Sequence, residues 1–430
     1  MRPLSRRSQP SHRVLIGAAA LFIASVVWGT ILRLRDDRIA LDAPPFRGNL
    51  GVVATWWVVP ALLLAPGMVF VVPRIVDRCS WRWLLAFSTL VTALWGVALA
   101  LTDRPSQLVE PIRTRYEYFR AVPLVGSPSQ FLATFLQRTS TFPLHVTAHP
   151  PAMVLVLWSL HRIGLGAAVF DAVLVVAAGV STVPAVLIAA REVAGEAAAR
   201  RAAPYVALLP AVLWIVTSSD AFFAGVAVWS GTLLVLASGR SDRRSDLMAL
   251  LAGLLAGFLF YLTYPAALFL LPGPVLALSR RRFRPLVLAL AAVIVVAVVF
   301  TASGFWWPDG LASSRVQYAR SVAQFRPYRY FVVANLAVAV FVVGPAVLAA
   351  FARLRDRGIV VLIAATATGL LIADLTGLSK GEVERIWLPF MPWLMLSTIS
   401  LPTTPRARRG WLAAQVTLTL ATQLVLRSEW

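Results

Sequence analysis

Long apolar runs alternate with short polar segments along almost the whole chain. A helix of about 17 to 25 apolar residues can cross the roughly 30 Å hydrocarbon core of a bilayer. The pattern therefore predicts an all-α polytopic membrane protein with about 13 membrane-spanning helices. The predicted spans are residues 14–33, 51–73, 83–101, 168–190, 204–219, 221–238, 247–263, 265–279, 285–303, 330–352, 358–377, 386–401 and 410–427.

One long polar interruption, residues 102–167, separates the third predicted span from the fourth. Its last part, HPPAMVLVLWSLHRIGLG, is apolar. We predict that it lies at the membrane surface or re-enters, because a further crossing would move later arginine-rich loops to the opposite side. The first apolar run, residues 15–32, follows a basic segment, as in a signal peptide, but lacks a small-residue cleavage site. We expect an uncleaved first helix.

Composition narrows the class of partner. Hydrophobic residues make up 59% of the chain, charged residues 14%, and the mean hydropathy is +0.76, so most side chains must face lipid or other apolar helices. The net charge of +21 comes from 40 lysine and arginine residues against 19 acidic ones. These basic residues are scattered between the spans, which favours membrane lipids and argues against a nucleic-acid partner. Cys79 is the single cysteine, so we expect neither a disulfide nor a thiolate metal cluster.

The loops between the predicted spans divide by charge. When the spans alternate, the short arginine-rich loops fall on one side, and the positive-inside rule places that side and the N-terminus in the cytoplasm. We therefore expect a cytoplasmic-membrane protein whose polar chemistry faces outside. The outer segments are residues 34–50, 102–167, 304–328 and 378–385.

Several outer residues could bind or catalyse. Asp171, Asp220 and Asp374 lie at predicted outer ends of spans, where an aspartate can cap a helix or serve a site. His145 and His149 are four residues apart, the spacing of two metal ligands on one helix face. Pro150 disfavours a helix through His149, so a hydrogen-bonding role and a plain structural role stay open for that histidine.

The order of short motifs resembles that of the GT-C glycosyltransferases, a superfamily that includes protein mannosyltransferases and the aminoarabinose transferases of lipid A. Asp103 opens the large outer segment, His149-Pro150-Pro151 starts a helix near its end, and TSSDAFF with Asp220 looks like the second outer loop of that fold. GEVERIWLPFMPWL resembles the closing element of several actinobacterial members. The resemblance covers roughly residues 83–400. It implies a catalytic domain over 83–430, with residues 1–82 as a two-span N-terminal addition.

The resemblance implies an inverting transfer of a sugar from a polyprenyl-phosphate donor to an envelope glycan or lipid acceptor on the outer face. The first-choice base is Asp103, and the alternative is Glu117, whose other expected role is an ion pair with neighbouring arginines. Fixed cations would hold the donor phosphate. The phosphate-binding candidates are His149, Arg104, Arg113, Arg115, Arg320 and Arg385. The other outer polar candidates are Asp220, His145, Glu382 and Glu384.

The sequence indicates no certain cofactor. A divalent cation stays possible, because the family's usual acidic pair is Asp103-Arg104 in this chain and leaves metal dependence undecided.

Two further readings stay open beside the enzyme. A transporter or lipid flippase also needs many spans and outer arginines, but it should carry charged residues at mid-membrane depth and related halves. A catalytically inactive scaffold of the same fold is the third reading. Asp103→Asn should separate an enzyme from the other two.

Overall fold

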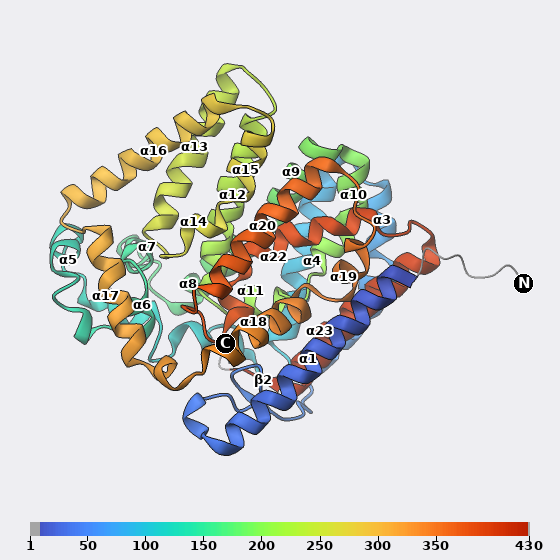
Figure 1. Cartoon of the computed structure of the whole chain (residues 1–430), viewed down its shortest axis with the longest axis horizontal. Coiled ribbons are helices and arrows are strands. Elements are labelled where there is room, and N and C mark those ends of the chain that lie inside the picture. Colours follow the sequence, from blue (N-terminus) through green and yellow to red (C-terminus); the bar gives the residue numbers. More distant parts are fainter. Residues whose placement is uncertain (1–8, 429–430) are drawn as a thin grey trace, which may run out of the picture.

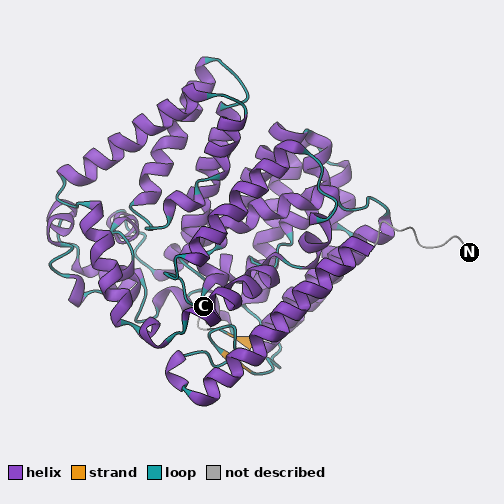
Figure 2. Ribbon diagram, in the orientation of Figure 1, coloured by secondary structure: helices purple, strands orange, loops and turns teal. Residues whose placement is uncertain are grey.

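Helices make up almost all the secondary structure in residues 9–428, the part of the chain that this computed structural model describes (Figures 1 and 2). The expected all-α class is confirmed for these residues. Two short strands, β1 (Asn49–Leu50) and β2 (Leu426–Arg427), pair antiparallel and join a segment near the N-terminus to the end of the chain. Residues 1–8 of the basic N-terminal segment lie outside the described part.

The first helices of the chain pack against its last third. They are α1 (Gln9–Arg35), the 3₁₀ turn η1 (Asp37–Ile39), α2 (Val58–Phe70), α3 (Val72–Arg78) and α4 (Trp81–Ala100). α1 contacts α18 (Tyr328–Val343) and α19 (Pro345–Phe351), and α19 in turn contacts α23 (Pro405–Val425) (Figure 1). α2 packs against α4 and α23. Residues 9–82 thus pack against the rest of the bundle, and the domain boundary at residue 83 stays a prediction.

The polar segment 102–167 forms short helical turns at one end of the bundle. They are η2 (Pro105–Leu108), η3 (Pro111–Arg113), η4 (Tyr118–Leu124), α5 (Pro128–Thr134), η5 (Thr139–Thr141), α6 (Leu144–Ala148) and α7 (Ala152–Arg162). The apolar α7 has 11 residues. At 1.5 Å per residue it is about 16 Å long, roughly half a hydrocarbon core. This length agrees with the expected helix that does not cross.

The middle of the chain supplies the centre of the bundle and a protruding pair of helices. Its elements are α8 (Ala168–Val180), α9 (Thr182–Ala194), α10 (Glu196–Ala207), α11 (Val212–Ile215), α12 (Asp220–Ala237), α13 (Arg243–Phe260), α14 (Ala266–Phe269), α15 (Pro272–Ser279) and α16 (Phe283–Ala302). The central α12 contacts α8, α9, α13 and α15. α16 packs chiefly on α13 and leaves its other faces exposed (Figure 1).

The last third of the chain closes the bundle. Besides α18, α19 and α23 it contains α17 (Trp307–Arg320), η6 (Val322–Phe325), α20 (Arg357–Leu375), α21 (Val383–Ile386), η7 (Leu388–Phe390), α22 (Met391–Leu394) and η8 (Met395–Ser400). The run from α21 to η8 is almost wholly buried and includes the fully enclosed Trp387 and Trp393. It is therefore core of the protein and not a lipid-facing helix.

The structure corrects the expected number of spans. Within residues 9–428, six helical stretches are long and apolar enough to cross a membrane, or eight if each of two bent pairs is one span, where 13 were expected. The six are in α1, α4, α8 with α9, α12, α16 and α20. The bent pairs are α2 with α3, at 44°, and α18 with α19, at 99°.

The five remaining predicted spans fail for physical reasons. Residues 204–219, 265–279 and 386–401 are apolar but broken into short helices, with prolines such as Pro210, Pro272 and Pro389 at or near the breaks. The helices α13 and α23 are continuous, but they carry charged residues in their first turns, including Arg243 and Arg406. Hydropathy alone could not distinguish these buried or charge-bearing segments from lipid-facing spans.

Hydrogen bonds join arginine-bearing turns that are distant in sequence. Arg408 Nη1 donates to Asp77 Oδ2 at 2.6 Å, and Arg282 Nη1 donates to Ser241 Oγ at 2.8 Å. The segments α5, α6 and α17 lie at the opposite end from the α12–α13 turn (Figure 1). The assignment of these ends to the two sides of a membrane stays a prediction.

Candidate functional site

Charged side chains from four distant segments meet at the end of the bundle that carries α6 and α17. Glu117 precedes η4, His145 lies in α6, Asp220 begins α12, and Glu382 and Arg385 belong to the segment around α21. We call these five residues the polar cluster. All five are buried, with 5% to 9% of their surface exposed. A buried charge is tolerated only when partners replace its water, so the contacts within the cluster define its geometry.

Arg385 joins the polar cluster at its centre. Its Nη1 donates to Asp220 Oδ2 at 2.6 Å, and its Nη2 donates to Glu382 Oε2 at 2.6 Å. The same Nη2 lies 3.3 Å from His145 Nε2. One planar guanidinium thus links the start of α12, the loop before α21 and the polar segment, which is the geometry that favours arginine over lysine.

The contacts of His145 determine its tautomer. A guanidinium can only donate, so His145 Nε2 accepts from Arg385, and the proton of a neutral ring must be on Nδ1. His145 Nδ1 lies 2.9 Å from Glu117 Oε1 and donates to it. Ser219 Oγ donates to Glu117 Oε2 at 2.8 Å. Both oxygens of Glu117 are therefore held, and this carboxylate is fixed in position and direction.

Two arginines outside the predicted set extend the cluster. Arg47 Nη1 donates to Glu382 Oε1 at 3.1 Å, and Arg326 Nη1 lies 3.6 Å from the same oxygen. Arg326 also donates to the backbone oxygens of Ile39 and Lys380, so its buried guanidinium ties the η1 loop to the α21 loop. Both lie in predicted outer segments, 34–50 and 304–328, but neither was selected for the site because nothing local distinguishes them from other loop arginines.

The cluster shifts the pKa values of its members outside the spans. Burial raises the pKa of Glu117, but His145 and Arg385 outweigh it and hold that pKa below its usual value. Burial also raises the pKa of Glu382, but three nearby guanidinium groups outweigh it and lower that pKa strongly. They belong to Arg385, Arg326 and Arg47. Burial lowers the pKa of Arg385, but Asp220 and Glu382 outweigh it and raise that pKa. Glu117, Glu382 and Arg385 are therefore charged at neutral pH.

His149 lies beside the cluster and is held differently. Its Nδ1 lies 3.2 Å from the backbone oxygen of Leu262 and must donate to it, which leaves Nε2 as an acceptor in the neutral ring. Its ring packs against Tyr118 and Phe223, at centroid distances of 5.9 and 5.5 Å. Burial lowers its pKa from 6.5 to about 4. His149 is thus neutral at pH 7 and suited to accept a hydrogen bond.

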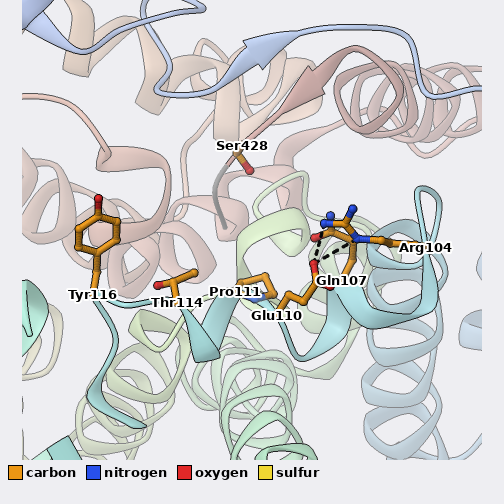
Figure 3. Close-up of a pocket in the computed structure, with 7 residues that line it drawn as sticks. All are labelled: Arg104, Gln107, Glu110, Pro111, Thr114, Tyr116 and Ser428. Carbon is orange, nitrogen blue, oxygen red and sulfur yellow. Dashed lines mark hydrogen bonds and ion pairs between the residues drawn. The ribbon is translucent and has the colours of Figure 1, made fainter. Parts of the chain in front are cut away.

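A pocket of about 250 Å³ lies next to the polar cluster, and its lining includes Tyr116, the residue before Glu117 (Figure 3). Tyr116 stands on one side of the pocket, and Arg104, paired with Glu110 at 2.7 Å, stands on the other. The backbone oxygen of Tyr116 accepts from His145 N–H at 3.0 Å, so this wall of the pocket is connected to the polar cluster. Gln107, Pro111, Thr114 and Ser428 complete the lining.

The remaining predicted site residues lie outside the polar cluster. Asp103, just after α4, is partly exposed and has no hydrogen bond or ion pair with the cluster. Arg113 lies over the Phe119 ring, 5.6 Å from its centroid, and the exposed Arg115 donates to the Tyr116 hydroxyl at 2.6 Å. Arg320 is exposed at the end of α17. Glu384 is buried on α21, on the same turn as Arg385.

The other two aspartates at span ends have local partners. Asp171 Oδ2 lies 3.3 Å from His161 Nε2, beside α7. Asp374 Oδ1 accepts from Asn335 Nδ2 at 3.0 Å, and the same amide nitrogen donates to the backbone oxygen of Ser379. These contacts fix α7 to α8 and α18 to α20, which is a structural role.

The donor set does not form a metal centre. Among the described residues, no three His, Cys, Asp or Glu side chains are arranged to hold a cation. Both oxygens of Glu117 and Oδ2 of Asp220 already have serine, histidine or arginine partners. We therefore derive no catalytic step that passes through a metal.

No protein-family model matches the chain, and no curated protein or solved structure matches it. The functional argument therefore rests on the residues and their geometry.

Proposed function

We propose that the protein is a membrane glycosyltransferase that moves a sugar from a polyprenyl-phosphate donor to an envelope glycan or lipid acceptor. The main support is the polar cluster, in which oriented carboxylates and a buried arginine meet at the ends of apolar helices. A lipid-linked donor needs both features, since its tail must be in the bilayer while its phosphate meets fixed cations at the surface. In this proposal the cluster faces outside the cytoplasmic membrane.

The proposed reaction needs one base and one stabilised leaving group. The acceptor hydroxyl oxygen attacks the anomeric carbon from the face opposite the phosphate, its proton passes to a carboxylate, and the carbon–oxygen bond to phosphate breaks. The electron pair leaves with the phosphate, and the configuration inverts. We assign the base to Glu117, which His145 and Ser219 orient. Arg385 and Arg47 supply positive charge for the departing phosphate.

Asp103, the first-choice base from sequence, is the competing assignment. An activity assay distinguishes the two assignments. Purified protein in proteoliposomes is incubated with a panel of polyprenyl-phosphate hexoses and pentoses, and the release of free polyprenyl phosphate is measured. We expect Glu117→Gln to lower turnover by about 10²- to 10⁴-fold, the usual contribution of a positioned base. Asp103→Asn should change it by less than about tenfold.

The control is Glu110→Gln, which removes an exposed carboxylate on the pocket rim. If Asp103→Asn abolishes release while Glu117→Gln does not, Glu117 is not the base. If no donor in the panel is consumed, the proposal fails, and transbilayer movement of lipid becomes the assay.

The transporter or flippase alternative has less support. In the six candidate spans, every charged side chain lies within four residues of a span end, as Asp171, Arg191 and Asp374 do. A coupled transport path needs ionisable groups at mid-membrane depth.

A further inference from the structure

Two turns meet at the arginine-rich end of the bundle, opposite the polar cluster. The α12–α13 turn and the α15–α16 turn are joined by Arg280, whose Nη1 donates to Ser238 Oγ at 3.2 Å, and by Arg282, whose Nη1 donates to Ser241 Oγ at 2.8 Å. In the first turns of α16 and α13, Arg284 pairs with Asp246 at 2.7 Å. The turns therefore form one surface.

That surface is strongly basic and has a shallow cavity. The cavity has a volume of about 330 Å³, and its lining is Glu192, Ser238, Gly239, Arg280 and Arg282. Arg280 and Arg282 contact only neutral oxygens in the hydrogen bonds that join the turns, so their charges are not neutralised by those bonds. Arg240, Arg243, Arg244 and Arg281 add exposed charge around the cavity.

The α15–α16 turn keeps an arginine where glycine is favoured. Arg281 has a φ of 57°, and the turn closes with Arg281 N–H donating to Leu278 O and Arg282 N–H to Ala277 O, both at 2.9 Å. This is a Schellman motif, whose left-handed position usually carries glycine because a side chain is strained there. Glycine at residue 281 would relieve this strain, so Arg281→Gly removes the charge without a cost to the backbone.

An apolar, exposed helix face continues directly from the cavity. α16 begins at Phe283, and only 11% of its apolar stretch is buried inside the protein. Phe283, Val287 and Leu290 are between 58% and 65% exposed. A molecule with an anionic head and an apolar tail could contact the arginines and this face at the same time.

We propose that the α12–α13 and α15–α16 turns bind the phosphate headgroup of an anionic membrane lipid, with its acyl chains along α16. Arginine forks bind phosphate oxygens through paired hydrogen bonds, and basic residues at the membrane surface attract anionic lipid. The adjoining apolar face favours a lipid over a soluble phosphate. Glu192 in the lining limits the charge that the cavity accepts, which suits a singly charged phosphodiester. This site is independent of glycosyl transfer.

Native mass spectrometry of the full-length protein in detergent tests the proposal. Bound lipid is counted during titration with phosphatidylglycerol or with phosphatidylcholine. We expect phosphatidylglycerol to bind in preference, and Arg282→Gln to weaken it roughly fivefold, since each surface arginine contributes about one such factor. Arg281→Gly should weaken it similarly without lowering the unfolding temperature, because glycine relieves the backbone.

The control is Arg315→Gln, which removes one exposed arginine from α17 at the other end of the molecule and should leave lipid binding unchanged. Equal weakening by Arg315→Gln would show that only net charge matters and would overturn the site. Equal binding of the two lipids would also overturn it, as would release of phosphatidylglycerol by millimolar inorganic phosphate.

Discussion

At the scale of residues, the cluster shows how ionised groups persist inside a largely apolar protein. Arg385 is 6% exposed, yet three side chains of the cluster surround its guanidinium. Removing one partner of such a set leaves an uncompensated buried charge, which typically costs about 3–5 kcal/mol. Each member is therefore held in place by the others, and a rigid arrangement of charge is what stabilisation of a developing phosphate requires.

His149 gives a pH dependence at this scale. Its pKa is about 4 in the folded protein and 6.5 when unperturbed, so between these values the unfolded chain binds a proton that the folded protein does not. Stability should therefore fall as pH drops from 6.5 toward 4. We expect His149→Gln to flatten this fall, measured as the unfolding temperature in detergent between pH 7 and 5.

The range from pH 7 to pH 5 lies above the pKa values of the cluster carboxylates Glu117 and Glu382. The pKa values of Glu117 and Glu382 are lowered from 4.5, so their contribution to stability is complete above that value and is lost only at lower pH. The same slope in wild type and His149→Gln would contradict the assignment of His149 as a neutral, buried group.

At the scale of elements, breaks in helices decide where the chain bends. α18 and α19 meet at 99° around Gly344, which has a φ of 81°. A Cβ at Gly344 would collide with the Gln415 side chain and with Pro210, so the bend requires both the left-handed backbone and the missing side chain. Neither requirement could be read from the apolar run 330–352, which predicted one membrane-spanning helix.

Gly344→Ala should destabilise the protein by about 1–3 kcal/mol, because it adds both backbone strain and a steric clash. Gly17→Ala is the matched control, since Gly17 lies within α1 with nothing within 4 Å of its Cβ position. That control should be neutral or slightly stabilising. Equal unfolding temperatures for the two variants would show that the bend does not depend on Gly344.

At the scale of the whole molecule, the N-terminal segment helps to build the site. Arg47 reaches Glu382 over 335 positions of sequence, and Arg326 joins the η1 loop to the loop before α21. The β1–β2 pair closes the same segment against the end of the chain. Residues 36–50 therefore have structural connections to both the cluster and the C-terminal helix.

Arg47→Ala should lower stability by about 1–2 kcal/mol, less than loss of a central partner, because Arg385 and Arg326 still compensate Glu382. Under the proposed function it should also reduce donor turnover severalfold. Arg38→Ala, which breaks an exposed pair with Asp36 in the same segment, should leave the unfolding temperature nearly unchanged. Equal effects of both variants on the unfolding temperature would mean that Arg47 acts only as a surface charge.

Sequence reasoning found part of the site. Glu117, His145, Asp220, Glu382 and Arg385 were all selected because they are polar residues in predicted outer segments, and the structure brings them together. It could not rank them above Asp103, Arg113 or Arg320, because proximity to a predicted span says nothing about which way a loop folds. For the same reason Arg47 and Arg326, which also lie in predicted outer segments, were not selected.

The sequence by itself determined that the protein is helical and rich in apolar segments, since hydropathy and the separation of charged loops follow directly from the order of residues. Only the tertiary structure decided which apolar runs face lipid, where they break, and which loop charges meet. Those outcomes depend on contacts between residues far apart in the chain, and a local pattern holds no information about such contacts.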